Sequence, residues 1–286
     1  MKPAPFRYHD PATLDDVVGL LGTLEDAKLL AGGQSLVPML NFRFAQPDHL
    51  IDLNGVSELF GVDHDGTRLR LGAMTRQSTL LDSQEVKQRL PVMAEALEWV
   101  GHFQTRSRGT IGGSLCNLDP AAELPVVALL YDAELAVRGP DGSRQVPMAE
   151  WPLAFMMPSL APEEVLSSIA LENWQGAHGY AFTEFARRHG DFAIVAIGCL
   201  LAVDDGKITR AAIAVGGARE TPYRLTPCEE ALVGQPASNE TFKAAAAIAR
   251  EQEAMSDAYV PSAYRQRLAG VLTERALATA AARAGN

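Results

Sequence analysis

Short apolar runs separated by polar turns dominate the first 75 residues. In residues 13–24 the apolar side chains recur at the 3.6-residue spacing of a helix, and acidic residues follow Thr13, where they suit the positive end of the helix dipole. The apolar run at 28–31 predicts a short buried strand that leads into the first of two glycine pairs. Ser35 is placed to cap the next helix. Further strands are expected at 49–53 and 68–74.

The middle of the chain has a mainly helical pattern. It predicts helices over 79–90 and 92–100, followed by a polar, basic loop over 102–109. The later expected elements are a buried helix that passes into a strand over 123–135, an extended piece after the turn at 139–143, and a strand at 163–171.

The pattern changes after the turn-rich segment 173–179, which we take as a domain boundary. Two β-rich runs, 192–203 and 207–218, are separated by Asp-Asp-Gly, a strong hairpin signal. Three helical segments follow, and the last begins at Ser262. Strands followed by terminal helices indicate an α+β fold, because a doubly wound fold would alternate strand and helix.

Composition and charge limit the possible partners. The 286 residues are 47% hydrophobic and 21% charged, with a formal net charge of −10. An acidic chain is a poor match for nucleic acid or anionic membranes, so an anionic ligand needs local donors. The beginning of the sequence has no apolar leader, and no apolar stretch has the length of a membrane span. We therefore expect a cytoplasmic protein without a membrane span.

The chain offers no clear catalytic or metal-binding set. Cys116, Cys199 and Cys228 are far apart and form no Cys-x-x-Cys pair, so we expect no metal or iron–sulfur site made by this chain alone. The six histidines lie beside no recurring Ser or Asp pattern. We assign no catalytic residue.

Two glycine pairs recur in the same setting. Both AGGQS (31–35) and TIGGS (110–114) place Gly-Gly just after apolar residues, with a serine within the next two positions. Glycine permits positive φ and close backbone approach, so successive N–H groups can form a nest for an anion. Two such loops could hold a diphosphate between them. The alternative is that each pair is only a tight turn, the commonest use of glycine. Neither loop has the spacing of a dinucleotide-binding or P-loop motif.

Four segments resemble a known family. They are FRYHDPATLDDVVGLL, AGGQSLVPMLNFR, RGTIGGSLCNLDPAAELPVVALL and RRHGDFAIVA. The chain resembles the FAD-binding medium subunits of the carbon monoxide dehydrogenase and xanthine dehydrogenase family, the molybdenum hydroxylases, from about residue 4 to 275. GGQSLVPML is about as similar to subunits of N-heterocycle (nicotine- or quinoline-type) dehydrogenases as to carbon monoxide dehydrogenase.

The resemblance implies a fold and its boundaries. It implies a two-lobed FAD-binding domain (PCMH/vanillyl-alcohol-oxidase-like) at 1–175, with subdomains of about 1–55 and 56–175. A C-terminal domain of antiparallel strands plus helices would occupy 176–286.

The resemblance also implies a set of cofactor-binding residues. The first diphosphate loop would comprise Ala31, Gly32, Gly33, Gln34 and Ser35, with Leu29, Leu30 and Leu36 nearby. The second would comprise Thr110, Ile111, Gly112, Gly113 and Ser114, although the family commonly has Asn at position 114. Glu123, often Asp in the family, would bind ribityl or ribose hydroxyls. Leu166 would border the adenine, and Phe192, often Tyr, would lie beside the isoalloxazine.

Simpler interpretations of these residues stay open. Glu123 could serve only as a favourable charge at a helix N-terminus. Phe192 could be a core residue of its β-rich run. For Arg106 and Arg108, a place in a solvated loop is the preferred interpretation, and a role near the phosphates is the alternative. Arg187, Arg188 and His189 could equally be a solvated strand end or positive charge near the flavin.

The implied function is electron transfer by non-covalently bound FAD. A partner large subunit would carry the molybdenum cofactor and oxidise a small substrate such as an N-heterocycle, CO or an aldehyde. A small subunit would relay electrons through two [2Fe–2S] clusters to this chain, which would pass them to an external acceptor. The assembly would be a dimer of heterotrimers, a heterohexamer. The alternatives are a stand-alone FAD-dependent reductase or oxidase of the same FAD fold, and a non-enzymatic scaffold in which the glycine loops are only turns.

Overall fold

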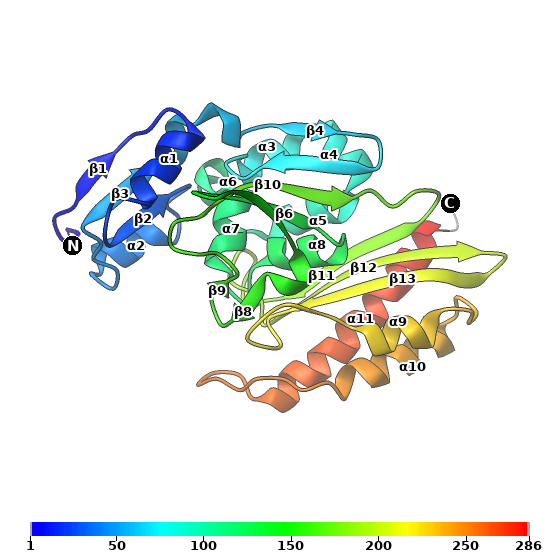
Figure 1. The fold of residues 1–286 in the computed structure, drawn as a ribbon. Helices are drawn as coiled ribbons and strands as arrows, with labels where there is room; N and C mark the ends of the chain where they lie inside the picture. The colour runs from blue at the N-terminus through cyan, green and yellow to red at the C-terminus, as the bar shows by residue number, and fades with distance from the viewer. Residues whose placement is uncertain (1, 285–286) are drawn as a thin grey trace.

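The computed structural model describes residues 2–284 and contains three main sheets. Figure 1 shows a small parallel sheet at the N-terminal end, a larger sheet with its helices in the middle, and long strands backed by helices at the C-terminal end. In this part of the chain no helix is both long enough and apolar enough to cross a membrane.

The first sheet has the order β1-β3-β2, and both strand pairs are parallel. Helix α1 begins after Thr13, where the sequence predicts a helix, and Thr13 caps it by accepting a hydrogen bond from the backbone N–H of Asp16. Val17, Val18 and Leu21 on the buried face of α1 share a core with Ile51 of β3. The elements are β1 (Arg7–His9), α1 (Leu14–Leu21), β2 (Ala27–Leu30), α2 (Leu36–Asn41), β3 (His49–Asp52), η1 (Leu53–Gly55) and η2 (Ser57–Leu59).

The second sheet is antiparallel, with the order β4-β5-β10-β6-β7. Its strands are β4 (Val62–His64), β5 (Arg68–Gly72), β6 (Glu134–Gly139), β7 (Gly142–Pro147) and β10 (Val165–Glu172). Its helices are α3 (Gln77–Asp82), α4 (Gln84–Arg89), α5 (Pro91–Trp99), α6 (Phe103–Arg108), α7 (Ile111–Asn117) and α8 (Glu123–Leu130). η3 (Met148–Glu150) and the hairpin of β8 (Pro152–Ala154) and β9 (Met157–Pro158) complete this region.

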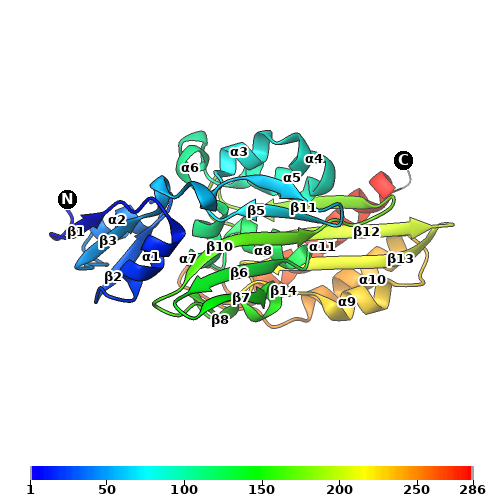
Figure 2. The same ribbon diagram turned by 45° about the horizontal axis from the view of Figure 1, so that its top comes forward.

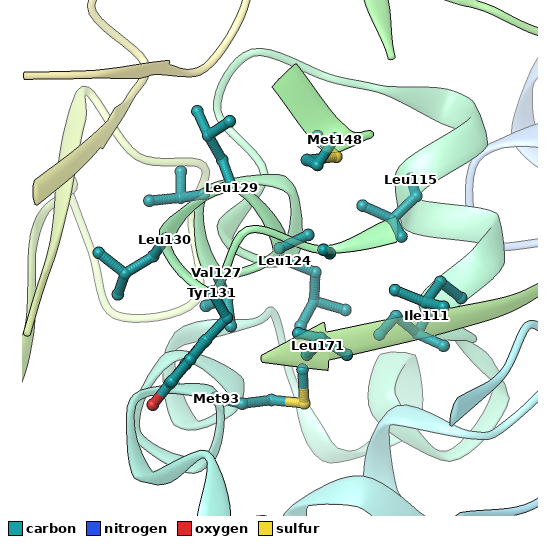
Figure 3. Packing of buried hydrophobic residues seen from close by; sticks show 14 of the residues in the cluster. Met93, Ile111, Leu115, Leu124, Val127, Leu129, Leu130, Tyr131, Met148 and Leu171 are labelled. Carbon is teal, nitrogen blue, oxygen red and sulfur yellow. The ribbon is translucent and has the colours of Figure 1, made fainter. Parts of the chain in front are cut away.

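The main core lies between the second sheet and its helices. Figure 3 shows Ile111 and Leu115 of α7 directed into the same cluster as Leu124 of α8 and Leu171 of β10. All four side chains are almost fully buried. This packing fixes α7, and with it the second glycine pair.

The third sheet is antiparallel, with the order β11-β12-β13-β14. It lies between α8 on one face and the terminal helices on the other, as Figures 1 and 2 show. The expected hairpin joins β12 to β13 through Asp205 and Gly206, both at positive φ. The elements are β11 (Gly179–Phe185), β12 (Val195–Asp204), β13 (Lys207–Gly216), β14 (Tyr223–Arg224), α9 (Thr226–Leu232), α10 (Asn239–Arg250) and α11 (Ser262–Ala284). The α+β prediction is confirmed.

Two local predictions are wrong, and one strand is not indicated by the sequence pattern. The helix expected over 79–90 is two helices, because Ser83 has an extended backbone and caps α4 through the N–H of Val86. The loop expected over 102–109 contains α6, which has no buried residue and hence no apolar period to reveal it. Strand β11 follows the turn-rich boundary segment, where the sequence pattern predicts no strand.

Candidate functional site

The first glycine loop leaves a run of backbone donors unused. Within residues 2–284, no acceptor pairs with the backbone N–H groups of residues 32–36. Gly33 has φ +72°, a conformation that favours glycine. Ser35 occupies the N-cap position of α2 but makes no capping hydrogen bond, so the predicted capping bond is wrong. The loop therefore presents five N–H groups and a free hydroxyl to a ligand, a donor set suited to an anion.

The two glycine loops are in direct contact. A Cβ atom at Gly32 would lie 2.2 Å from the carbonyl oxygen of Arg108 and 2.9 Å from Cα of Gly109. A Cβ at Gly113 would lie 3.5 Å from Cβ of Ala31. The backbone just before TIGGS thus occupies the space beside Gly32, and the absent side chain allows the loops to meet.

The second loop differs from the first because its own chain uses its N–H groups. Ile111 donates to the carbonyl of Thr75, Gly112 to that of Ala73, and Gly113 to the hydroxyl of Thr110. A Cβ at Gly112 would lie 2.6 Å from the carbonyl oxygen of Ala73. The second glycine pair therefore serves close packing of α7 against the end of β5, and it is not a second nest of free donors.

Asn54 and Arg76 connect the two loops. Asn54 donates to the carbonyl of Ala31 at 3.2 Å, and the Arg76 guanidinium donates both to the Asn54 side chain and to the carbonyl of Arg108. Burial lowers the pKa of Arg76, and the neighbouring charge of Arg108 lowers it further. Two guanidinium groups close together in an acidic chain favour an anion at this place. Sequence reasoning missed Asn54 and Arg76, because neither belongs to a local motif.

Helix α7 leads from the loops to a cavity. It spans seven residues, so the two places are separated by about 10 Å. The cavity has a volume of about 580 Å³, within the usual range of ligand sites. Its walls come from residues 119–121 after α7, Phe155 of the β8–β9 turn, residues between 187 and 194, the segment before α11, and Arg265 of α11.

The predicted ring neighbour lies in this cavity. Phe192 is 68% exposed and lines the wall, which excludes the core interpretation of this residue. Leu166, by contrast, is 3% exposed and belongs to the main core. Leu29, Leu30, Leu36 and Ser114 are half-buried, and Gln34 is exposed, with its side-chain amide donating to the carbonyl of Gly32.

Glu123 lies near a second buried acid, which no motif in the sequence indicates. Glu123 begins α8 and is 6% exposed, and Glu184 of β11 is 8% exposed with no partner for either carboxyl oxygen. Burial raises the pKa of Glu123 to about 7, and Asp119 raises it too. Burial and the neighbouring Glu123 raise the pKa of Glu184 to about 8.

Sheet register explains how the two acids meet. Glu184 pairs with Ala196, which pairs with Gly216, so these residues form a row across the third sheet. A Cβ at Gly216 would lie 2.5 Å from the Val126 side chain, and the first turn of α8 therefore rests on this row. The two carboxyls are consequently enclosed between α8 and the third sheet.

Some basic residues near the site hydrogen-bond to the protein backbone, and others are exposed or lie against aromatic rings. Arg106 donates to the carbonyls of Val100 and Gly101 and so completes the end of α5. Arg108 is exposed beside the first loop. Arg187 lies over the ring of Tyr259, and His189 stacks on Trp99. In residues 2–284, no group of three or more His, Cys, Asp or Glu side chains is placed to hold a metal.

Comparisons with known proteins identify the family of the chain. Residues 4–174 match the family described as the FAD binding domain in molybdopterin dehydrogenase. Residues 180–280 match the CO dehydrogenase flavoprotein C-terminal domain. The 6-hydroxypseudooxynicotine dehydrogenase complex subunit alpha of Paenarthrobacter nicotinovorans is 37% identical over 99% of this chain and 97% of the relative.

Two solved structures have the same fold throughout. Carbon monoxide dehydrogenase from Hydrogenophaga pseudoflava, in a form that lacks the Mo-pyranopterin moiety, matches with a TM-score of 0.96 and 37% identity over 99% of both chains. Quinoline 2-oxidoreductase from Pseudomonas putida 86 matches with a TM-score of 0.96 and 33% identity over the full length of both chains.

The fold and the loops define a flavoprotein subunit of an oxidoreductase. The chain belongs to the FAD-binding medium subunits of the carbon monoxide dehydrogenase and xanthine dehydrogenase family.

Proposed function

We propose that FAD binds with its diphosphate against the free N–H groups of residues 32–36 and its isoalloxazine ring in the cavity beside Phe192. The observation that carries this proposal is the run of five N–H groups without an acceptor in residues 2–284. A nearby pair of guanidinium groups, those of Arg76 and Arg108, supports an anion here. The roughly 10 Å length of α7 between the loops and the cavity suits an elongated cofactor.

The remaining assignments differ in how directly they are supported. Ala31 and the half-buried Gly113 lie where the two loops meet, and the half-buried Ser114 follows Gly113, so we keep all three as proposed FAD contacts. Thr110, Ile111 and Gly112 act by positioning α7, because their polar groups are already hydrogen-bonded. Leu166 is buried in the main core, so its contact with the adenine stays a prediction, and Leu29, Leu30 and Leu36 flank the first loop.

We propose that Glu123 binds ribityl or ribose hydroxyls of FAD. A carboxyl whose pKa is raised to about 7 is protonated in part of the molecules at neutral pH, so it can donate as well as accept a hydrogen bond. It is almost covered by protein, and its position at the start of α8 lies within a few residues of the cavity wall at 119–121.

The chain then acts as the electron-transfer subunit of a molybdenum hydroxylase. FAD supplies the redox chemistry and the protein supplies binding and orientation. We propose that a small subunit with two [2Fe–2S] clusters delivers the electrons. A large subunit with the molybdenum cofactor binds and hydroxylates an N-heterocycle, CO or an aldehyde, and the whole is a dimer of heterotrimers. This assembly is supported by the similarity of the chain, along nearly its full length, to a subunit of a dehydrogenase complex.

Domain limits and compartment are further parts of the proposal. We divide the chain at about residue 175, because one family match ends at residue 174 and the other begins at residue 180. Within the first domain we propose subdomains of about 1–55 and 56–175. We place the protein in the cytoplasm, and the three unpaired cysteines suit a reducing compartment. Cell fractionation with an antibody against the chain tests the compartment.

A two-stage experiment tests the function. The purified chain is titrated with FAD and its visible spectrum recorded, and we expect stoichiometric, non-covalent flavin. The native protein is then isolated with any co-purifying chains and analysed for molybdenum and iron. A colourless chain that does not bind FAD would overturn the flavoprotein proposal. A lone chain that oxidises an organic substrate by itself would instead favour a stand-alone flavoenzyme.

A further inference from the structure

Arg265 is the most deeply buried cation at the cavity. It lies in the first turn of α11 and is 4% exposed, although it contributes to the cavity wall. Removing a guanidinium from water is unfavourable unless its N–H groups find acceptors. The hydrogen bonds of Arg265 therefore identify the parts of the molecule that it holds.

Three segments converge on this side chain. Nη1 of Arg265 donates to the carbonyl oxygens of Ile194 and Gly217, both at 2.6 Å, and Nη2 forms an ion pair with Asp257. These acceptors come from the β11–β12 loop, the residue after β13, and the segment before α11. One planar group with several fixed donors can join all three, which a lysine ammonium at the end of a flexible stem cannot do in the same way.

Each of the three acceptor residues is connected to a different part of the cavity wall. Ile194 is two residues beyond Phe192 in the same wall. Gly217 donates its N–H to the carbonyl of Pro120, another wall residue, at 2.7 Å. Asp257 accepts from the backbone N–H groups of Tyr259 and Val260, at 2.7 and 2.8 Å, and so shapes the last part of the wall.

We infer that Arg265 is a positioning residue for the flavin ring. It fixes the wall that carries Phe192 relative to the segment after α7 and the segment before α11. The inference rests on the proposed FAD site, because it concerns the ring end of that site. The diphosphate end is separated from it by the length of α7, so the two ends can be perturbed independently.

The charge of Arg265 has a second consequence. Without this guanidinium, the Asp257 carboxylate stays beside the cavity without its cationic partner. Negative charge near the ring disfavours the reduced flavin, which carries more negative charge than the oxidised form. Loss of Arg265 should therefore lower the midpoint potential of the bound FAD.

The test uses the full chain reconstituted with FAD and the variants Arg265→Met and Arg265→Lys. We expect both variants to bind oxidised FAD within about threefold of the wild-type Kd, since residues 32–36 are untouched. In Arg265→Met, binding of reduced FAD should weaken about tenfold more than binding of oxidised FAD, which for a two-electron couple lowers the midpoint potential by about 30 mV. Arg265→Lys keeps the charge, so its potential should shift less, while both variants should alter the visible circular dichroism of the flavin.

Arg224→Met provides a matched control. Arg224 is also a partly buried arginine of the C-terminal region, and it pairs with Asp132 and Glu229 away from the cavity. Its replacement should lower stability but leave the flavin dichroism and potential unchanged.

The outcomes separate this inference from the proposed function. A wild-type chain that does not retain FAD would overturn both. A wild-type chain that retains FAD, with wild-type dichroism and potential in Arg265→Lys and Arg265→Met, would overturn the positioning role alone. If Arg265→Met does not fold, the dichroism of Arg265→Lys decides.

Discussion

The carbonyl oxygen of Arg108 occupies the space where a side chain at Gly32 would begin, 2.2 Å from the ideal Cβ position. Both contacting groups are backbone, so neither can move aside without shifting a loop. We predict that Gly32→Ala separates the two loops, weakens FAD binding by at least about tenfold, equivalent to about 1.4 kcal/mol, and destabilises the fold by roughly 1–3 kcal/mol. Titration with FAD and thermal unfolding measure the two effects.

Gly19→Ala is the control for this substitution. Gly19 lies within α1, and a Cβ there would have no atom within 4 Å. Alanine in a helix interior should stabilise the chain by up to about 1 kcal/mol and leave FAD affinity unchanged. Equal FAD affinity in Gly32→Ala and Gly19→Ala would contradict the assignment of the first loop.

Ser35 and Thr13 both occupy N-cap positions, but only Thr13 forms the capping bond. We predict that Thr13→Ala lowers stability by about 1 kcal/mol without changing FAD affinity. Ser35→Ala should leave stability nearly unchanged and weaken FAD binding several-fold, because its hydroxyl is free for the ligand. The same unfolding and titration experiments check both variants, and loss of stability without loss of affinity in Ser35→Ala would refute the ligand role.

The elements that the sequence predicts well carry local signals. The start of α1 at Thr13, its 3.6-residue period and the turn at Asp205 and Gly206 are decided within a few residues, and the structure has all three. Helix α6 has no buried side chain, so no apolar period marks it. Its six residues are held by neighbours in space, as when Gln77 donates its backbone N–H to the carbonyl of Gly109 next to the helix.

The site is less predictable than the fold for a physical reason. The two glycine pairs look alike in sequence, yet one has free N–H groups and the other donates to Ala73 and Thr75. That difference depends on the end of β5, about 40 residues earlier in the chain. The connection of Asn54 to Arg76 and the pairing of Glu123 with Glu184 likewise depend on tertiary register, which no spacing motif encodes.

Phe192 is 68% exposed at the cavity, so it contributes little to the core. We predict that Phe192→Ala changes stability by no more than about 0.5 kcal/mol but alters the absorption and dichroism of bound FAD. Phe103→Ala is the matched control, since Phe103 is 70% exposed on α6 and does not line the cavity. Identical flavin spectra in the two variants would remove Phe192 from the ring site.

The Glu123 and Glu184 carboxyls should make stability depend on pH. Burial raises the pKa of Glu184 to about 8, above its value of about 4.3 in an unfolded chain. The contribution of protonated Glu184 to stability is therefore fully present below about pH 4 and is lost as pH rises through about 8. Glu184→Gln keeps the shape without the charge, so we predict a higher Tm than wild type at pH 9 and a similar Tm at pH 4.

Thermal unfolding across this pH range measures the effect, with about 2–4 °C expected for each kcal/mol. Glu163→Gln removes an exposed carboxyl and should follow the wild-type curve. If the Tm of wild type and of Glu184→Gln changed with pH in parallel, ionisation of Glu184 would not affect stability, which would contradict the prediction. A gap that opens as the pH rises from about 4 to about 8, and persists above pH 8, would show that Glu184 keeps its proton at the interface between α8 and the third sheet. FAD affinity measured over the same pH range would then show whether cofactor binding depends on the protonation of Glu123.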